Sequence, residues 1–286
     1  MTYFCRRYYL IHKSQKRMKK TVLLLAACAL SMMSVRGETT FEIEAGAEVV
    51  SNYLWRGQTC GGLSFQPDVT LKLDGNFGRF DLDLWGNIGG VNSDEDDDFA
   101  TSKKFGLGKT AEFAPELDVT LSYSIKGFTV GLTHYHYFDR SWFDMDNELW
   151  AEGNQLEGFL KYTISDDLPL SFGWYTILSG TDGKPDGSSL KRAYSTYVEV
   201  GYDFSLPADL TLNTTLGFSP WSSMYTGYDK DFAINNLSAR LEREWSLWNE
   251  TATLTVFAQP MFNFYDASDF QYGKNFMWAI GCGLWF

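Results

Sequence analysis

The sequence lacks a long apolar segment after its first 37 residues, and this absence excludes a helical membrane protein. A helix that crosses a bilayer needs about 20 consecutive, mostly apolar residues. Proline is scarce as well (7 of 286 residues), whereas glycine (26 residues) and aromatic residues (17%) are plentiful. Such a composition favours strands joined by tight turns. A membrane-spanning β-barrel has the same composition, because only alternate residues of each strand need be apolar.

Basic residues, cysteine and histidine are also scarce beyond residue 37. Residues 1–37 hold eight of the 24 Lys and Arg residues and no Asp or Glu, which leaves 16 basic against 36 acidic residues and a net charge of −20. This acidity disfavours nucleic acid and anionic lipid as partners and favours cations. Of the four cysteines, only Cys60 and Cys282 remain, which are too few for a disulfide framework.

Residues 1–37 have the organisation of a secretory signal. A basic start at Met18-Lys19-Lys20 precedes an apolar run over residues 22–35 and small residues before a cleavage point. We therefore expect residues 1–37 to be an over-extended start plus a signal peptide, with Met18 rather than Met1 as the start, and residues 38–286 to be the exported domain. The stretch before Cys28 matches a lipoprotein cleavage box, but apolar residues continue past it, which favours the signal peptide.

The last twelve residues, 275–286, alternate between large apolar and mostly small side chains. Phe276, Trp278, Ile280, Cys282, Leu284 and Phe286 occupy one face. A period of two over this length predicts a strand. The segment resembles the carboxyl-terminal assembly signal of Gram-negative outer-membrane barrels, which typically ends in Phe. The resemblance implies that Trp278, Ile280, Leu284 and Phe286 are read by the barrel-assembly machinery.

Eleven further stretches show the same period. They cover residues 41–56, 63–74, 79–84, 117–125, 128–138, 156–164, 170–174, 194–204, 210–218, 237–242 and 252–258, with Val50 and Leu54 interrupting the first. Connections are short after even-numbered strands and long after odd-numbered ones, except after the first. Outer-membrane barrels divide periplasmic turns from external loops in this way. The sequence thus predicts an all-β fold, a 12-stranded antiparallel transmembrane β-barrel with up-and-down meander order and both termini in the periplasm.

Charged residues alternate with the apolar ones, and we expect them to face a wet lumen. A soluble sandwich or lipocalin-like barrel would instead turn its apolar set inward. The expected lumen-lining charges are Glu42, Glu44, Glu48, Arg56, Asp68, Lys72, Arg79, Asp81, Asp83, Glu157, Lys161, Glu199 and Arg240. Charges of both signs can pair across water, and the acidic excess predicts a preference for cations.

The segment Ser51-Asn52-Tyr53-Leu54-Trp55-Arg56-Gly57, with Pro67 in the next strand, resembles the opening hairpin of TorF-type porins. That family carries a Ser-x-Tyr-x-aromatic-Arg-Gly pattern, although the continuation over residues 58–62 departs from it. The resemblance implies a small outer-membrane channel and transfers no catalytic residue. From the residues themselves, Arg56 is an inward cation near the outer end of the first strand, and a structural salt bridge is its favoured role.

Three motifs of chemical interest have plainer explanations. Residues 106–110 resemble the end of a phosphate-binding loop, but Lys103 stands where the motif needs its first Gly. His134 and His136 could share a metal, yet the alternation puts them on the apolar face with Tyr135 and Tyr137 turned inward. The acidic stretch 92–98 lacks the ordered ligand spacing of a calcium site. We therefore expect no metal site and no cofactor.

Three functions remain open from the sequence. The first is passive diffusion of small, cationic or neutral solutes through a porin in the cell outer membrane. The second is a closed structural or adhesive barrel whose long outer loops bind a partner. The third and weakest is an outer-membrane lipid hydrolase, which would need Ser and His side by side on the outward face. Outer-membrane lipid is the expected surrounding, nucleic acid is not an expected partner, and the solute and the oligomeric state stay undetermined.

The two exported cysteines provide a first test. We expect Cys60 at the outer tip of the first connection and Cys282 facing lipid near the periplasmic end, too far apart to form a disulfide. The intact mass of the exported protein should therefore be the same before and after reduction. A gain of two protons per molecule on reduction would contradict this expectation.

Overall fold

The computed structural model describes residues 39–91, 112–113, 115–137, 154–265 and 276–286. The predicted signal segment with Met18 and Cys28, the acidic stretch 92–98 and the loop at 106–110 lie outside the described residues. In the described part of the chain, no helix is long and apolar enough to cross a membrane.

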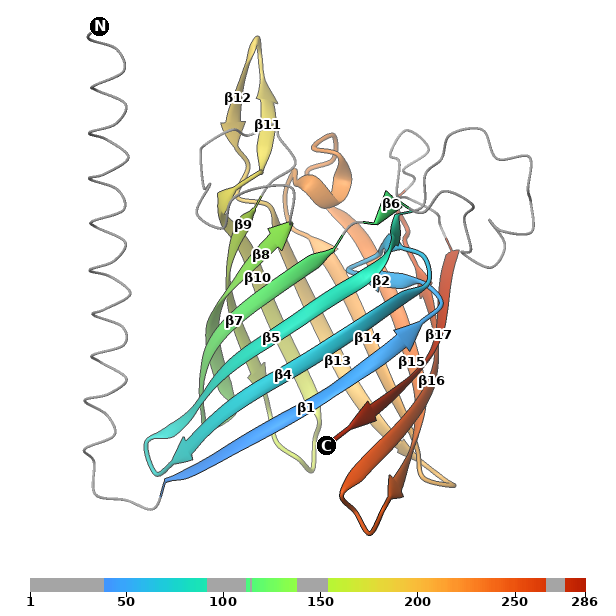
Figure 1. Ribbon diagram of the computed structural model, residues 1–286. Helices are drawn as coiled ribbons and strands as arrows, with labels where there is room; N and C mark the ends of the chain where they lie inside the picture. Colours follow the sequence, from blue (N-terminus) through green and yellow to red (C-terminus); the bar gives the residue numbers. More distant parts are fainter. Residues whose placement is uncertain (1–38, 92–111, 114, 138–153, 266–275) are drawn as a thin grey trace, which may run out of the picture. The chain divides into compact units, whose positions relative to one another are not determined.

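Twelve strands form the wall of a closed antiparallel barrel (Figure 1). They are β1 (Thr40–Val50), β4 (Ser64–Gly75), β5 (Gly78–Val91), β7 (Glu116–Ile125), β8 (Phe128–Tyr137), β9 (Gln155–Thr163), β10 (Leu170–Gly180), β13 (Thr196–Leu206), β14 (Leu210–Ser219), β15 (Ala233–Leu247), β16 (Ala252–Phe262) and β17 (Phe276–Trp285). Each wall strand pairs with its neighbours in sequence, and β17 pairs with β1. The predicted 12-stranded up-and-down barrel is confirmed.

Smaller elements lie at one end of this barrel, in the connections between wall strands. Strand β6 (Glu112–Phe113) extends the sheet beside the end of β5, and β11 (Gly183–Asp186) pairs with β12 (Ser189–Arg192) in a projecting hairpin (Figure 1). The 3-10 turn η1 (Met224–Thr226) lies between β14 and β15. Strands β2 (Tyr53–Trp55) and β3 (Gln58–Gly61) form a separate hairpin between β1 and β4.

The two ends of the barrel differ in the length of their connections. Between β4 and β5, and between β7 and β8, only two residues join the strands, namely Asn76-Phe77 and Lys126-Gly127. At the opposite end the connections are longer and carry the hairpins and η1 (Figure 1). We refer to these as the short-turn end and the long-loop end. Strand β1 begins, and strand β17 finishes, on the short-turn side of the barrel.

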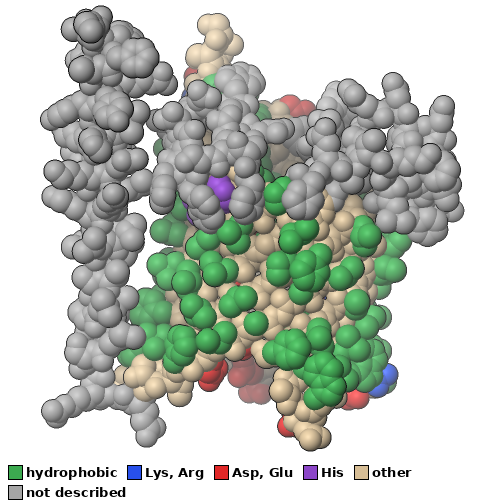
Figure 2. Space-filling model, in the orientation of Figure 1, with side chains coloured by type: hydrophobic (Ala, Val, Ile, Leu, Met, Phe, Trp, Pro, Cys, Tyr) green, Lys and Arg blue, Asp and Glu red, His purple; other side chains and the backbone are tan. Residues whose placement is uncertain are grey.

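The outer surface of the barrel is apolar. Figure 2 shows hydrophobic side chains spread over the visible wall, with charged side chains seen at the rims. The large apolar residues of this surface are well exposed, including Phe41 (62%) and Ile280 (53%). Charged and hydroxyl side chains occupy the alternate positions, because successive residues of a strand point to opposite faces. Monomeric proteins in water rarely expose an apolar surface of this extent.

The closing seam between β1 and β17 is shorter than the other wall contacts. Strand β17 pairs with five residues of β1 (46–50), whereas β4 pairs with all eleven. The carboxyl-terminal residue lengthens the seam by one step, since Phe286 N donates to Ala45 O (2.8 Å) and Ala45 N donates to Phe286 O (3.2 Å). The ring of Phe286 also stacks on Trp248, with centroids 6.1 Å apart.

The expectation that the first strand runs over residues 41–56 is wrong. Strand β1 ends at Val50, and the backbone hydrogen bonds to the final strand end one residue later, where Ser51 N donates to Ile280 O (2.9 Å). Two side chains then replace the backbone at the seam: Ser51 Oγ accepts a hydrogen bond from Ile280 N (3.0 Å), and Asn52 Nδ2 donates one to Trp278 O (2.9 Å). Because these side chains satisfy the edge of β17, the main chain can leave the wall at this point.

The seam gives a test of assembly. Deleting Phe286 removes two of its backbone hydrogen bonds and the ring contact with Trp248, so the fraction of protein that reaches the folded, membrane-inserted state should fall. Phe276→Ala, at the other end of the same strand, is the matched control, because it removes an exposed ring and leaves the seam intact. Folding is measured by the gel mobility of unheated membrane samples. Equal losses in the two variants would contradict a special role for the terminal residue.

Candidate functional site

The hairpin of β2 and β3 enters the barrel interior. Trp55 pairs with Gln58, so that Arg56 and Gly57 form a two-residue turn. Both have positive φ angles, +46° for Arg56 and +83° for Gly57, which is the geometry of a type I′ turn. Gly adopts this conformation freely, whereas Arg does so at some cost in free energy. The turn therefore needs contacts that compensate for the conformation of Arg56.

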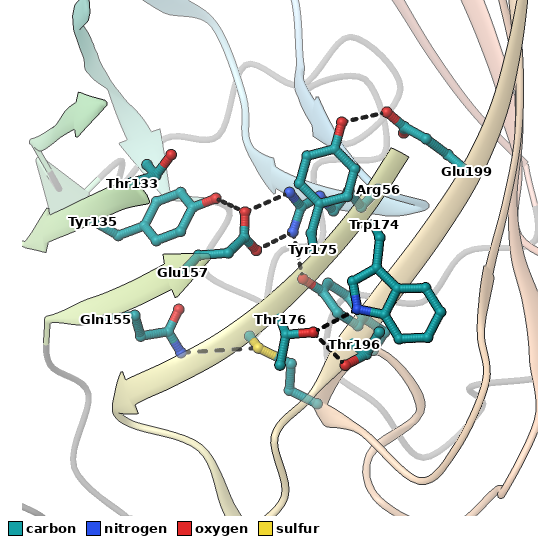
Figure 3. Close-up of polar contacts among 12 residues, drawn as sticks. Arg56, Thr133, Tyr135, Gln155, Glu157, Trp174, Tyr175, Thr176, Thr196 and Glu199 are labelled. Carbon is teal, nitrogen blue, oxygen red and sulfur yellow. Dashed lines mark hydrogen bonds and ion pairs between the residues drawn. The ribbon is translucent and has the colours of Figure 1, made fainter. Parts of the chain in front are cut away.

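The guanidinium of Arg56 makes such contacts on the far side of the interior (Figure 3). Its Nη1 and Nη2 atoms donate to Glu157 Oε2 (2.5 Å) and Oε1 (2.8 Å), and Nη1 also donates to Tyr225 OH (2.7 Å). Glu157 Oε1 accepts a further hydrogen bond from Tyr135 OH at 3.0 Å. The side chains of Arg56 and Glu157 are only 9% and 1% exposed. A bidentate, buried pair of this kind fixes the orientation of both partners.

Aromatic rings surround the same guanidinium. Its central carbon lies 4.1 Å from the ring centroid of Tyr175, 4.6 Å from Trp55, 5.1 Å from Tyr197 and 6.0 Å from Tyr225. These distances are in the range of cation–π attraction. We call these residues, with Tyr135 and Glu157, the Arg56 cluster. It draws on the hairpin, on wall strands β8, β9, β10 and β13, and on η1.

The tip of the hairpin also fits closely against wall strand β15. A Cβ atom on Gly57 would lie 1.7 Å from the carbonyl oxygen of Asn235, so that only glycine can occupy this position. Asn263 Nδ2 donates a hydrogen bond to Gly57 O (2.9 Å). Inside the wall, Gly217 leaves room for the ring of Tyr197, whose hydroxyl would lie 2.1 Å from an added Cβ atom. Near the base of the hairpin, the ring of Tyr53 packs 5.3 Å from that of Trp85. The hairpin thus crosses the interior and contacts several parts of the wall.

Most of the charged residues expected in the lumen occur as pairs. The ion pairs are Arg56–Glu157, Lys72–Glu44, Arg79–Asp81 (3.0 Å), Arg240–Glu48 (2.7 Å) and Arg240–Glu242 (2.8 Å). The Arg240–Glu48 pair joins β15 to β1 across β16 and β17, which requires both side chains to point inward. The guanidinium of Arg240 also lies 3.5 Å from the ring centroid of Phe257.

The other expected lumen charges have different surroundings. Lys161 lies 5.2 Å from the ring centroid of Phe159 and 5.5 Å from that of Tyr175, and Glu199 accepts a hydrogen bond from Tyr175 OH (2.6 Å; Figure 3). Glu42 is exposed near the free end of β1, opposite Lys72 in register. Asp68 and Asp83 lie on either side of the Thr70 hydroxyl.

Several residues of the Arg56 cluster were not anticipated from the sequence. Tyr175 and Tyr197 share the inward face of their strands with Gly173 and Glu199, so the alternation could have identified them. Tyr225 lies in η1, within a long connection that has no period, and its contact with Arg56 spans 169 residues of sequence. No local signal indicates it.

The two histidines lie on the face of β8 opposite to Tyr135, and His136 is buried there (1% exposed) rather than open at the outer surface. The ring centroids of His134 and His136 are 6.1 Å apart, and His136 Nδ1 lies 3.0 Å from Asn154 Oδ1. Tyr135, between them, points into the interior toward Glu157. In the described ranges, no group of three or more His, Cys, Asp and Glu side chains could hold a metal ion.

The two thiols are free, and one lies elsewhere than expected. Cys282 is exposed, whereas Cys60 is partly buried in β3 of the inward hairpin rather than at an outer tip. The difference has the same cause as the shorter first strand, because the whole segment after Val50 turns into the barrel.

Comparison with known proteins gives a likeness of fold only. No family model matches the chain, and no curated protein matches it. The structure of a Salmonella typhi OmpF complex with daunomycin aligns over 87% of this chain and 98% of its own length, with 9% identity and a TM-score of 0.39. A porin structure refined at 1.8 Å resolution aligns over 86% of this chain and 100% of its own, with 11% identity and a TM-score of 0.32.

The Arg56–Glu157 pair can be tested by stability. Arg56→Ala leaves the Glu157 carboxylate buried without its cation and should lower the free energy of unfolding by about 3–5 kcal/mol. Arg56→Lys should lose less, since it keeps the charge but not the two-pronged geometry. The measurement is denaturant unfolding of the detergent-solubilised barrel.

The matched control is Arg79→Ala, which removes an arginine that is also paired with an Asp but is 44% exposed. It should cost about 1 kcal/mol or less. If the two alanine variants were equally stable, the Arg56 cluster would not be a structural anchor.

Proposed function

We propose that the protein is an outer-membrane channel through which small solutes diffuse passively, narrowed at its long-loop half by the 53–61 hairpin. The observation that supports this most strongly is the contrast between the two faces of the wall. Large apolar side chains point outward along the strands, and charged or hydroxyl side chains point inward. Such a wall is stable with lipid outside and water inside.

The charges of the interior favour cations over anions. Five carboxylates line the neighbouring strands β1, β4 and β5. Glu44, Glu48 and Asp81 are paired with Lys72, Arg240 and Arg79, whereas Asp68 and Asp83 have no ion pair among the described residues. A narrow passage lined by an excess of carboxylates concentrates cations and repels anions. Solutes would pass beside the hairpin, and the Arg56 cluster would limit their size.

The proposal includes a location and an orientation. The chain would lie in the cell outer membrane, with its short-turn end and both chain termini in the periplasm and its long loops outside. Its assembly would depend on the barrel-assembly machinery reading Trp278, Ile280, Leu284 and Phe286. The resemblance of residues 51–57 to TorF-type porins agrees with this function, since the motif forms the inward hairpin.

A second candidate is a closed barrel with a structural or adhesive role. It is favoured by one observation: Glu157, Tyr197 and Tyr225 inside the barrel are almost completely buried. In that case the projecting β11–β12 hairpin and the other long loops would bind a partner.

Bilayer recordings distinguish the candidates. The purified protein, reconstituted in a planar bilayer under a KCl gradient, should pass current with a reversal potential of the sign expected for K⁺ over Cl⁻. Glu44→Gln and Asp83→Asn together should shift that potential toward zero, because they remove lumen charge without altering the Arg56 cluster. Absence of current would favour the closed barrel, and preference for Cl⁻ would contradict the role assigned to the carboxylates.

A further inference from the structure

Three aspartates on adjacent strands share one patch of the inner wall. Asp68 of β4 and Asp118 of β7 are both cross-strand partners of Trp85 in β5, so that the three residues lie in one row. Asp83 lies two residues from Trp85 on the same face of β5. Diagonal neighbours on a sheet face are about 7–8 Å apart, within reach of one another's side chains. We call Asp68, Asp83 and Asp118 the carboxylate arc, with Trp85 at its centre.

The carboxylate arc has no positive charge within ion-pair distance in the described part of the chain. Three nearby basic side chains are engaged elsewhere: Lys72 with Glu44, Arg79 with Asp81, and Arg56 with Glu157. A fourth, Lys161, interacts with Asp83 at longer range and lies over the rings of Phe159 and Tyr175. Over the described residues, no ion pair involves Asp68, Asp83 or Asp118. Asp68 Oδ1 and Asp83 Oδ1 are 3.4 Å and 2.8 Å from the same donor, the Thr70 hydroxyl, which can donate to only one of them at a time.

Asp118 adds an independent sign that a ligand is missing. Its side chain points into the interior and the residue is only 9% exposed, yet its Oδ1 atom has no hydrogen-bond partner within the described structure. Its charged neighbours include Glu116, Glu157 and Asp83 on the negative side and Arg56 on the positive side. A buried acceptor without a donor costs stability, more so when it is charged. A cationic donor in the arc would remove that cost.

The aromatic side chain at the centre indicates which kind of cation fits. The indole of Trp85 lies in the row between Asp68 and Asp118, and its other neighbour is the ring of Tyr53. Indole attracts cations and also packs against alkyl groups. The aspartates do not converge as a metal-binding group among the described residues. An organic ammonium therefore fits the arc better than a divalent metal ion.

We propose that the carboxylate arc binds the primary ammonium group of a small organic amine. The ammonium N–H groups donate hydrogen bonds to the carboxylates of Asp83 and Asp118, the charge of Asp68 adds to the attraction, and the alkyl chain packs on Trp85. Since Tyr53 and the hairpin cover the arc on the long-loop side, the amine enters from the short-turn end. The inference rests on the proposed water-filled lumen and names the class of cation that the lumen holds.

The test uses the full-length barrel in detergent, with n-butylammonium as the probe and n-butanol as its uncharged counterpart. Calorimetric titration should detect binding of n-butylammonium and not of n-butanol. Asp83→Asn and Asp118→Asn should each weaken binding about tenfold or more, as expected for loss of a charge-assisted hydrogen bond. The matched control is Asp203→Asn, a carboxylate of β13 whose partner is Asn213; it should bind as the wild type does.

The outcomes separate this inference from the proposed function. Binding of n-butylammonium with no bilayer current would refute the channel and keep the arc. Current with no binding, or binding that survives in both Asp83→Asn and Asp118→Asn, would refute the arc and keep the channel. If Asp118→Asn fails to fold, as judged by its unheated gel mobility, then Asp83→Asn and Asp68→Asn decide the result.

Discussion

The buried pair between Arg56 and Glu157 is the interaction on which the interior of this barrel depends. It joins a turn of the first connection to wall strand β9, 101 residues away in sequence, with two charged hydrogen bonds. The pair offsets the unfavourable φ angle of Arg56, and it adds to the contacts that Gly57 and Tyr53 make with the wall. The surrounding tyrosines serve the same end, because they place polarisable ring faces and hydroxyl groups around a desolvated cation.

The wall and the hairpin have different roles: the wall pairs the backbone, and the hairpin fills part of the interior. A closed sheet pairs all backbone groups between strands, which lets apolar side chains face lipid. It also encloses a space that the charged inward face keeps polar. The Arg56 cluster and the Tyr53–Trp85 contact fill part of this space in the long-loop half, while the acidic faces of β1, β4 and β5 continue below them. Selection by size and selection by charge would thus occur at different heights in the same lumen.

Much of this architecture follows from the sequence, and the reasons are physical. A period of two extending over twelve stretches predicts wall strands reliably, because one face of each must be apolar from end to end. The same period predicts that Glu48, Asp83 and Arg240 point inward. The hairpin was not predicted, because the alternation of apolar and polar residues continues from β1 into β2 with only Val50 and Leu54 out of phase. The two strands therefore read as one. The partners Glu157 and Tyr225 could not be assigned, because contacts across a lumen leave no trace in local patterns.

The central claim, that the Arg56 cluster holds a constricting hairpin in the lumen, is tested most directly by single-channel conductance. The variant to compare with the wild type is Arg56→Ala combined with Glu157→Ala, which removes both partners and leaves no lone buried charge. With the hairpin released, the unit conductance at fixed salt should rise several-fold while the barrel remains folded. An unchanged unit conductance would mean that the hairpin does not limit the passage, and the account would fail.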